Sequence, residues 1–156
     1  MFLGVSRTHA FLGLQPGERN FWCVQASTRI ARPGDQLLLY FPVAASRLIN
    51  GIGQVYRITS EPTSRLGSPC TSRGMSHIDT ELLLTFEERV TAKDMKKDAS
   101  VRNWPPLARY LQGTTFVVSS DFWPALRALI VSKDPRADAV LEPAPSGQPA
   151  QRGATK

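Results

Sequence analysis

Apolar residues gather in short runs along the chain, and turn-forming residues separate the runs. The clearest run is Leu37–Phe41, which follows Pro33-Gly34-Asp35 and ends at Pro42. A continuous apolar run of this length predicts a strand buried on both faces, and proline, glycine and aspartate favour the turn before it. The run "FLGV" at residues 2–5 predicts a first strand near the N-terminus.

Further strands are predicted where β-branched and aromatic residues dominate. These segments are residues 21–24, 51–60, 78–90 and 115–118. Gly51 and Gly53 interrupt the second of them, which predicts a bulge or a close approach of another backbone. Asn50-Gly51 predicts a tight turn leading into that strand.

The remaining segments predict loops, short helices and a tail. Ser, Thr, Gly and Pro dominate residues 62–77, which predicts a long loop of the kind that often carries function. A short helix is expected at 105–111, and a longer one runs to Val131 from a cap at Ser120 or Asp121. Its apolar residues, at positions 122, 123, 126, 129 and 130, share one helical face.

The order of elements predicts an α+β fold with a mixed or antiparallel, barrel-like sheet and short flanking helices. Long helices do not alternate with the strands, which excludes a doubly wound α/β unit. The chain has 156 residues, enough for one domain. We assign that domain to residues 1–133. Residues 134–156, rich in Pro, Ala and Gly, are predicted to be a flexible tail because they offer little apolar surface to bury.

Charge shifts the functional expectation modestly toward nucleic acid. The net charge is +6 and the pI is about 9.8, and a basic surplus favours binding to phosphate backbones. The alternative is that the basicity is incidental, as in many small proteins. No apolar run approaches the ~20 residues that a membrane-spanning helix needs, so no membrane partner is expected.

The cysteines and histidines do not form a recognisable metal or catalytic motif. Cys23 and Cys70 belong to no CxxC pair, and together with His9 and His77 they lack the spacing of a zinc site. We expect no metal, no cofactor and free thiols in a reducing cytoplasm. The alternative is that Cys23 acts as a nucleophile with His9 or His77, although a cysteine beside tryptophan is more often packed core. No catalytic constellation is recognisable, and the protein is not expected to be an enzyme.

Three segments together resemble a known family. "RPGDQLLLYF", "INGIGQVYRITSEP" and "GTTFVVSSDFWPALRALI" are similar in order and character to segments of the EVE domain, a member of the PUA-like superfamily. The resemblance covers residues 1–133 and implies a PUA-like fold. The ASCH domains of the same superfamily include members with suspected catalysis, but their Gly-x-Lys-x-x-Glu signature is not visible here.

The segment "NFWCVQAS" at residues 20–27 resembles the "IWCST" segment of the related YTH domains. The resemblance implies that Trp22 is one wall of an aromatic cage for a methylated base and that the backbone of Cys23 contacts that base. Ser6 resembles the polar residue that follows the first strand in both families. Two departures are that the 62–77 loop contains no tryptophan and that Phe2 and Leu3 stand where EVE domains have tryptophan or tyrosine.

The candidate site therefore combines a base pocket with a basic surround. The pocket residues are Ser6, Phe21, Trp22, Cys23, Tyr40 and Trp104. The candidate phosphate-binding residues are Arg7, Arg29, Arg32, Arg47, Arg65 and Arg73. Lys93, Lys96 and Lys97 form a second basic cluster or a solvated face. Trp22, Tyr40 and Trp104 have the alternative reading of core residues, and Trp123 is expected to be core.

The leading hypothesis is a non-catalytic module that binds DNA or RNA and receives a flipped, modified base against Trp22. Aromatic stacking contributes about 1–3 kcal/mol per base, and flipping costs a few kcal/mol. The second hypothesis is a small enzyme or small-molecule-binding protein on the same fold. The third is an interaction protein whose basicity is incidental, with a protein partner that the sequence does not identify.

Overall fold

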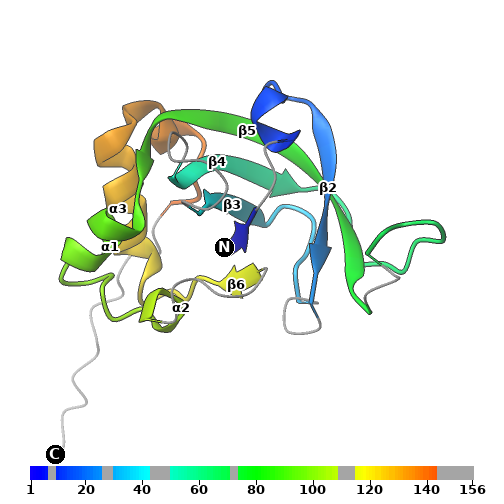
Figure 1. Cartoon of the computed structure of the whole chain (residues 1–156). Helices are drawn as coiled ribbons and strands as arrows, with labels where there is room; N and C mark the ends of the chain where they lie inside the picture. Colours follow the sequence, from blue (N-terminus) through cyan, green and yellow to red (C-terminus); the bar gives the residue numbers. More distant parts are fainter. Residues whose placement is uncertain (7–9, 26–29, 43–49, 71–73, 109–114, 144–156) are drawn as a thin grey trace, which may run out of the picture.

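The computed structural model describes residues 1–6, 10–25, 30–42, 50–70, 74–108 and 115–143. Within them, one six-stranded sheet has the order β2-β5-β4-β3-β1-β6 (Figure 1). The strands are β1 (Phe2–Val5), β2 (Arg19–Val24), β3 (Gln36–Phe41), β4 (Gly51–Ile58), β5 (Ser76–Val90) and β6 (Thr115–Val117). The helices are α1 (Ala92–Lys97), α2 (Pro105–Ala108) and α3 (Trp123–Lys133), and 3₁₀ helices span Ala10–Gly13 and Pro135–Ala139.

The sheet is mixed, as the sequence predicts. β1 runs parallel to β3, and the other neighbouring strands pair antiparallel. β3 lies between β1 and β4 and is buried along its whole length, which confirms the two-sided burial expected for the apolar run Leu37–Phe41.

The glycines of β4 allow the close approach that the sequence predicts. Gly51 has a positive φ of 110°, and a side chain there would meet the carbonyl oxygen of Val90 at 2.6 Å. The pairing of β4 with β5 shifts register between Ile52 and Gln54, on either side of Gly53. Both positions therefore favour glycine over any larger residue.

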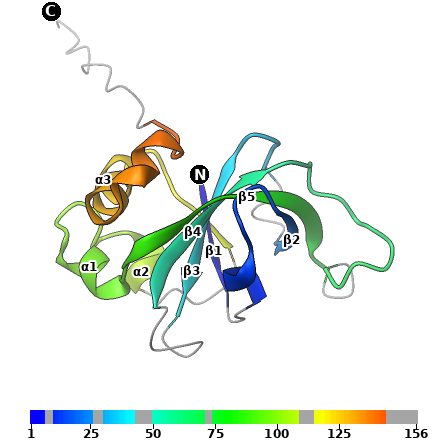
Figure 2. The same ribbon diagram turned by 90° about the horizontal axis from the view of Figure 1, so that it is seen from above.

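Two apolar clusters cover the two faces of the sheet. The helix-side cluster includes Leu38, Tyr40, Trp104, Trp123 and Ile130, and it lies under the helices. The barrel-side cluster contains Phe2, Leu37, Leu39, Phe41, Tyr56, Ile58, Ile78 and Leu82, with Trp22 and Phe11 packed against it. Figures 1 and 2 both place α1, α2 and α3 together at one end of β5, whereas the β4–β5 connection projects at the other end.

The start of one helix and the presence of another differ from the prediction. α3 begins at Trp123, and neither Ser120 nor Asp121 caps it, because the N–H groups of Phe122 and Trp123 donate to the carbonyl oxygen of Ser119. α1 was not predicted. Its signal is a reciprocal capping box between Thr91 and Asp94, in which each side chain bonds the backbone of the other residue.

The predicted tail begins too early. Asp134 is 3% exposed, and Ala137 and Leu141 are buried in the helix-side cluster. Asp134 caps the 3₁₀ helix Pro135–Ala139 and also accepts a hydrogen bond from the backbone N–H of Glu87 on β5 at 3.0 Å. The domain assignment at 1–133 therefore has to be extended through Leu141. Residues 144–156 lie outside the described residues.

The Asp134 cap predicts a specific loss of stability in acid. The Arg136 guanidinium and the Glu87 and Arg136 N–H groups hold the pKa of Asp134 at about 2. A lowered pKa stabilises the fold above the ordinary carboxyl pKa and loses that contribution as pH falls through about 2. We expect Asp134→Asn to destabilise the protein by about 2.5 kcal/mol at pH 7, because folding lowers the pKa of this carboxyl from 3.8 to about 2 and each unit of pKa corresponds to ~1.4 kcal/mol.

Urea unfolding of wild type and Asp134→Asn at pH 7, 4 and 2.5 measures this contribution. The difference between the two proteins should shrink toward pH 2.5, where the wild-type carboxylate begins to take up a proton. A difference that stays constant over this range would contradict the assigned role. Glu142→Gln serves as the matched control, because Glu142 follows Leu141 and its hydrogen bonds with Gln36 and Arg127 use its backbone N–H and carbonyl groups.

No helix in the described part of the chain is both long enough and apolar enough to cross a membrane.

Candidate functional site

Strand alternation divides the predicted base pocket along β2. Successive side chains of a strand point to opposite faces. Trp22 packs against the barrel-side cluster, whereas Phe21 stacks on His77 and Cys23 bonds Cys70 on the outer face. These three consecutive residues therefore do not line one pocket, although they were predicted to do so.

Trp22 joins the two edges of the curled sheet. β2 is one edge strand and β6 is the other. The indole Nε1–H of Trp22 donates to the hydroxyl oxygen of Thr115 on β6 at 2.9 Å, which brings the edges together and closes a half-barrel. A side chain at Gly4 on β1 would lie 2.9 Å from the indole Cζ2 atom, so the ring packs directly over the glycine backbone.

The indole is fixed in position but is not sealed inside. Phe11 lies 5.6 Å from it, centroid to centroid, with the ring planes tilted by 58°. Trp22 remains half-buried, whereas its neighbour Val24 is fully buried. The ring thus combines a rigid setting with partial access, which are the properties required of a stacking wall.

Ser6 lies on the strand that supports the indole. Its backbone N–H donates to the carbonyl oxygen of Tyr40 at 2.9 Å and extends the β1–β3 pairing by one residue, and its side chain is buried. Counting along the strand, Ser6 has the same orientation as Gly4, over which Trp22 packs. Of the predicted pocket, Ser6 and Trp22 are therefore the pair that shares one face of the sheet.

Tyr40 and Trp104 lie elsewhere. Tyr40 is 5% exposed and Trp104 is 2% exposed, and both belong to the helix-side cluster. The Tyr40 hydroxyl lies 3.4 Å from the Asn50 side-chain oxygen, and burial raises the pKa of that phenol. Both rings are core residues, the alternative considered for them, because Tyr40 on β3 and Trp104 directly before α2 pack into the helix-side cluster. Trp123 is core, as expected.

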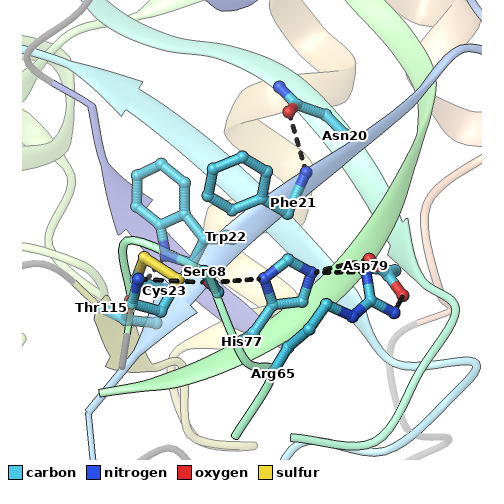
Figure 3. The surroundings of a disulfide bond; sticks show 10 residues. Asn20, Phe21, Trp22, Cys23, Arg65, Ser68, His77, Asp79 and Thr115 are labelled. Carbon is cyan, nitrogen blue, oxygen red and sulfur yellow. Dashed lines mark hydrogen bonds and ion pairs between the residues drawn. A yellow bond between two sulfur atoms is a disulfide. The ribbon is translucent and has the colours of Figure 1, made fainter. Parts of the chain in front are cut away.

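A hydrogen-bonded series of polar side chains that was not predicted lies on the outer face of β2 and β5 (Figure 3). His77 Nε2 lies 2.8 Å from Asp79 Oδ1, and His77 Nδ1 lies 3.0 Å from Ser68 Oγ. The hydrogen bond from His77 is the main cause that holds the pKa of Asp79 below its usual range. Because an ionised carboxylate only accepts, Nε2 carries the proton and donates it, and the Ser68 hydroxyl donates to Nδ1 when the ring is neutral.

The 62–77 loop contributes two members of this series. Arg65 pairs with Asp79 at 3.3 Å, and Ser68 accepts a hydrogen bond from the N–H of Cys70 at 3.2 Å. A signal in the sequence was available, because His77 and Asp79 are two residues apart on a strand and therefore share one face. The loop residues that complete the series had no such signal.

Cys23 and Cys70 form a disulfide, with their Cα atoms 5.2 Å apart. The expectation of free thiols, and with it a Cys23 nucleophile, is therefore wrong. Disulfides persist mainly in oxidising compartments, so the bond does not fit the reducing cytoplasm from which free thiols were expected. Sequence spacing gave no hint because the two residues are 47 positions apart and meet only through the pairing of β2 with β5.

The candidate phosphate-binding arginines are only partly described. Arg7, Arg29, Arg47 and Arg73 lie outside the described residues. Arg32 is exposed in the turn before β3, and Arg65 is exposed on the outer face. Lys93, Lys96 and Lys97 belong to α1, which lies at the other end of β5 from the β4–β5 connection, the segment that contains Arg65 (Figure 2). In the described part of the chain, no three His, Cys, Asp or Glu side chains gather as metal ligands would.

Comparison with known proteins finds relatives by structure alone. No family model matches, and no curated protein matches. A Pseudomonas putida protein is 18% identical, with a TM-score of 0.59 over 82% of this chain and 97% of that one. A hypothetical protein from Leishmania major is 12% identical, with a TM-score of 0.62 over 84% and 94% of the two chains.

The DUF55 domain of human thymocyte nuclear protein 1 is also similar. It is 12% identical, with a TM-score of 0.61 over 82% of this chain and 96% of that one. Identities this low establish a shared fold and nothing finer. The expected α+β architecture is confirmed: a mixed sheet curls into a half-barrel with short helices beside it.

Proposed function

We propose that the protein is a nucleic-acid-binding module in which a base stacks against Trp22. The observation that carries the proposal is the half-buried indole, which is fixed by Gly4 and Thr115 where the two edges of the sheet meet. A flat, rigid aromatic loses little entropy on binding, and every base offers a π-face to it. The net charge of +6 supports a polyanionic ligand over a neutral one.

The proposal also specifies the family of the protein and the kind of base that it binds. The chain would be an EVE-type member of the PUA-like group, and the base would be flipped out of its strand and modified. Ser6, on the same face as Trp22, would read its edge. Flipping costs a few kcal/mol, which is the same order as stacking on one aromatic ring. Additional contacts to the phosphates would then set the affinity without reading the sequence.

Fluorescence polarisation with labelled single strands of DNA and RNA, methylated and unmodified, tests the proposal. Trp22→Leu should weaken binding about tenfold to a hundredfold, since stacking contributes ~1–3 kcal/mol per base. Wild-type affinity should also fall steeply with salt. Equal affinity of wild type and Trp22→Leu, with the fold of the variant confirmed by circular dichroism, would contradict the proposal.

A second candidate function is a small enzyme, which the hydrogen-bonded side chains of Ser68, His77 and Asp79 favour. Their residue types and hydrogen-bond order match those of a serine–histidine–carboxylate relay, with the roles of the ring nitrogens exchanged. In this reading Ser68 attacks an ester carbonyl and passes its proton to His77 Nδ1. The burial of Ser68 and the Phe21 ring over the imidazole oppose access by a substrate.

A fluorophosphonate probe distinguishes the two candidates. Covalent labelling of wild type that is absent in Ser68→Ala would support the enzyme. Failure to label either protein, together with binding of single strands, would support the binding module.

A further inference from the structure

The outer face of β2 carries an exposed aromatic ring with a fixed backing. Phe21 is 38% exposed. Its ring stacks on the His77 imidazole with the centroids 5.0 Å apart and the planes inclined by only 13° (Figure 3). The two rings are nearly parallel and offset, so the imidazole packs against part of the phenyl ring while Phe21 as a whole stays exposed.

The backing does not move easily. His77 is 5% exposed, and both of its ring nitrogens are bonded, one to Ser68 and one to Asp79. The Cys23–Cys70 disulfide ties the loop that carries Ser68 to β2, two residues beyond Phe21. Holding an aromatic ring in place before binding reduces the entropy that is lost when a flat ligand stacks on it.

The outer face of the sheet carries a small basic excess, because two of its three arginines are paired with carboxylates. The outward positions of β2, β4 and the first half of β5, together with the loop residue Arg65, carry three guanidinium groups and two carboxylates: Arg19, Arg57, Arg65, Asp79 and Glu81. The side chains of Arg57 and Arg65 are more than half exposed, at 53% and 58%, whereas those of Glu81 and Asp79 are 31% and 32% exposed. The basic groups thus reach farther into solvent than the acidic ones.

Phe21 and Trp22 are neighbours in sequence but face opposite sides of an edge strand. In the described part of the chain β2 pairs with β5 alone, so its other side is a sheet edge, which the Trp22–Thr115 hydrogen bond links to β6. A ligand that crosses this edge beside that contact would meet the indole on one side and the phenyl ring on the other. A single strand of nucleic acid has bases in series along a charged backbone, which fits two aromatic surfaces separated by a strand edge and flanked by arginines.

We propose that Phe21 is a second stacking site, which receives a base of the same single strand next to the one held at Trp22. The Trp22 half of this arrangement rests on the function proposed above. The Phe21 half stands on the exposed ring, its locked backing and the arginines. Arg65 contacts the phosphate beside the stacked base while it keeps its pairing with Asp79.

Oligonucleotide length provides the test. Octamers and mononucleotides of the same base are titrated against wild type, Phe21→Leu and Phe21→Tyr. Phe21→Leu should weaken octamer binding about tenfold, the loss expected for one stacked base, and should weaken mononucleotide binding less, because a single nucleotide can still stack on Trp22. Phe21→Tyr keeps the ring and should bind the octamer like wild type. Ile30→Ala removes an exposed apolar side chain that is not aromatic and is the matched control.

The outcomes separate the two proposals. Octamer affinity that falls with Phe21→Leu and not with Trp22→Leu would support the Phe21 site and contradict the proposed function. Affinity that falls with Trp22→Leu alone would overturn the Phe21 site and leave the proposed function standing. An octamer that does not bind wild type, or an equal loss in Ile30→Ala and Phe21→Leu, would also overturn the Phe21 site.

Discussion

Replacing both Cys23 and Cys70 with serine is expected to lower the free energy of unfolding by about 4 kcal/mol, the largest effect of any change considered. The disulfide closes a loop between residues 47 positions apart. Such a crosslink restricts the unfolded chain, and the stabilisation grows slowly with the length of the closed loop. It also fixes the loop that supplies Ser68 and Arg65 to the outer face.

Urea unfolding with and without a dithiol reductant measures this effect. Wild type should lose about as much stability on reduction as it does in the double serine variant, since both lack the same crosslink. The double variant is the matched control, because the reductant should leave it unchanged. Identical midpoints for wild type in both conditions would show that Cys23 and Cys70 are not bonded in the protein in solution.

Replacing Gly4 with valine is expected to cost about 3 kcal/mol, at the upper end of the usual range for overpacking a core. Glycine within a strand is normally a liability, and adding a side chain should help by a fraction of a kcal/mol. At this position the new Cβ atom would lie 2.9 Å from the Trp22 ring. The indole would have to move, and its hydrogen bond to Thr115 would then be lost.

Gly13→Val is the matched control because a side chain there meets no atom within 4 Å. The free energy of unfolding of both variants is measured in urea. A loss confined to Gly4→Val, with a shifted Trp22 indole N–H signal, is the expected result. Equal stability of the two variants would contradict the packing of Trp22 over β1.

The strands were predictable because their signals are local. Leu37–Phe41 is flanked by a turn and by proline, and β3 occupies nearly those residues. The glycines of β4 indicated a close approach, which Gly51 makes to Val90. α1 was also predictable from local sequence, because Thr91 and Asp94 have the spacing of a capping box at the start of a helix. The extent of the domain was not predictable in this way, because Asp134 and Leu141 are ordered by contacts with distant elements.

The candidate site was harder to predict because it depends on strand pairing. The alternation of β2 was available in the sequence and separates Phe21 and Cys23 from Trp22. The contact of Trp22 with Gly4 and Thr115 was not available, since it requires the sheet to curl until its two edges meet. The Cys23–Cys70 bond was not predicted, because free thiols were expected in a reducing compartment and a separation of 47 residues gives no pairing signal.

The central claim is that a base stacks on Trp22, and the indole N–H signals of the three tryptophans test it most directly. In a ¹⁵N-edited NMR spectrum, Trp22→Phe identifies the Trp22 signal by its disappearance. Titration with a single-stranded octamer should shift that signal and leave those of Trp104 and Trp123 in place, because both of these rings are buried. An octamer that binds without moving the Trp22 signal would contradict the account.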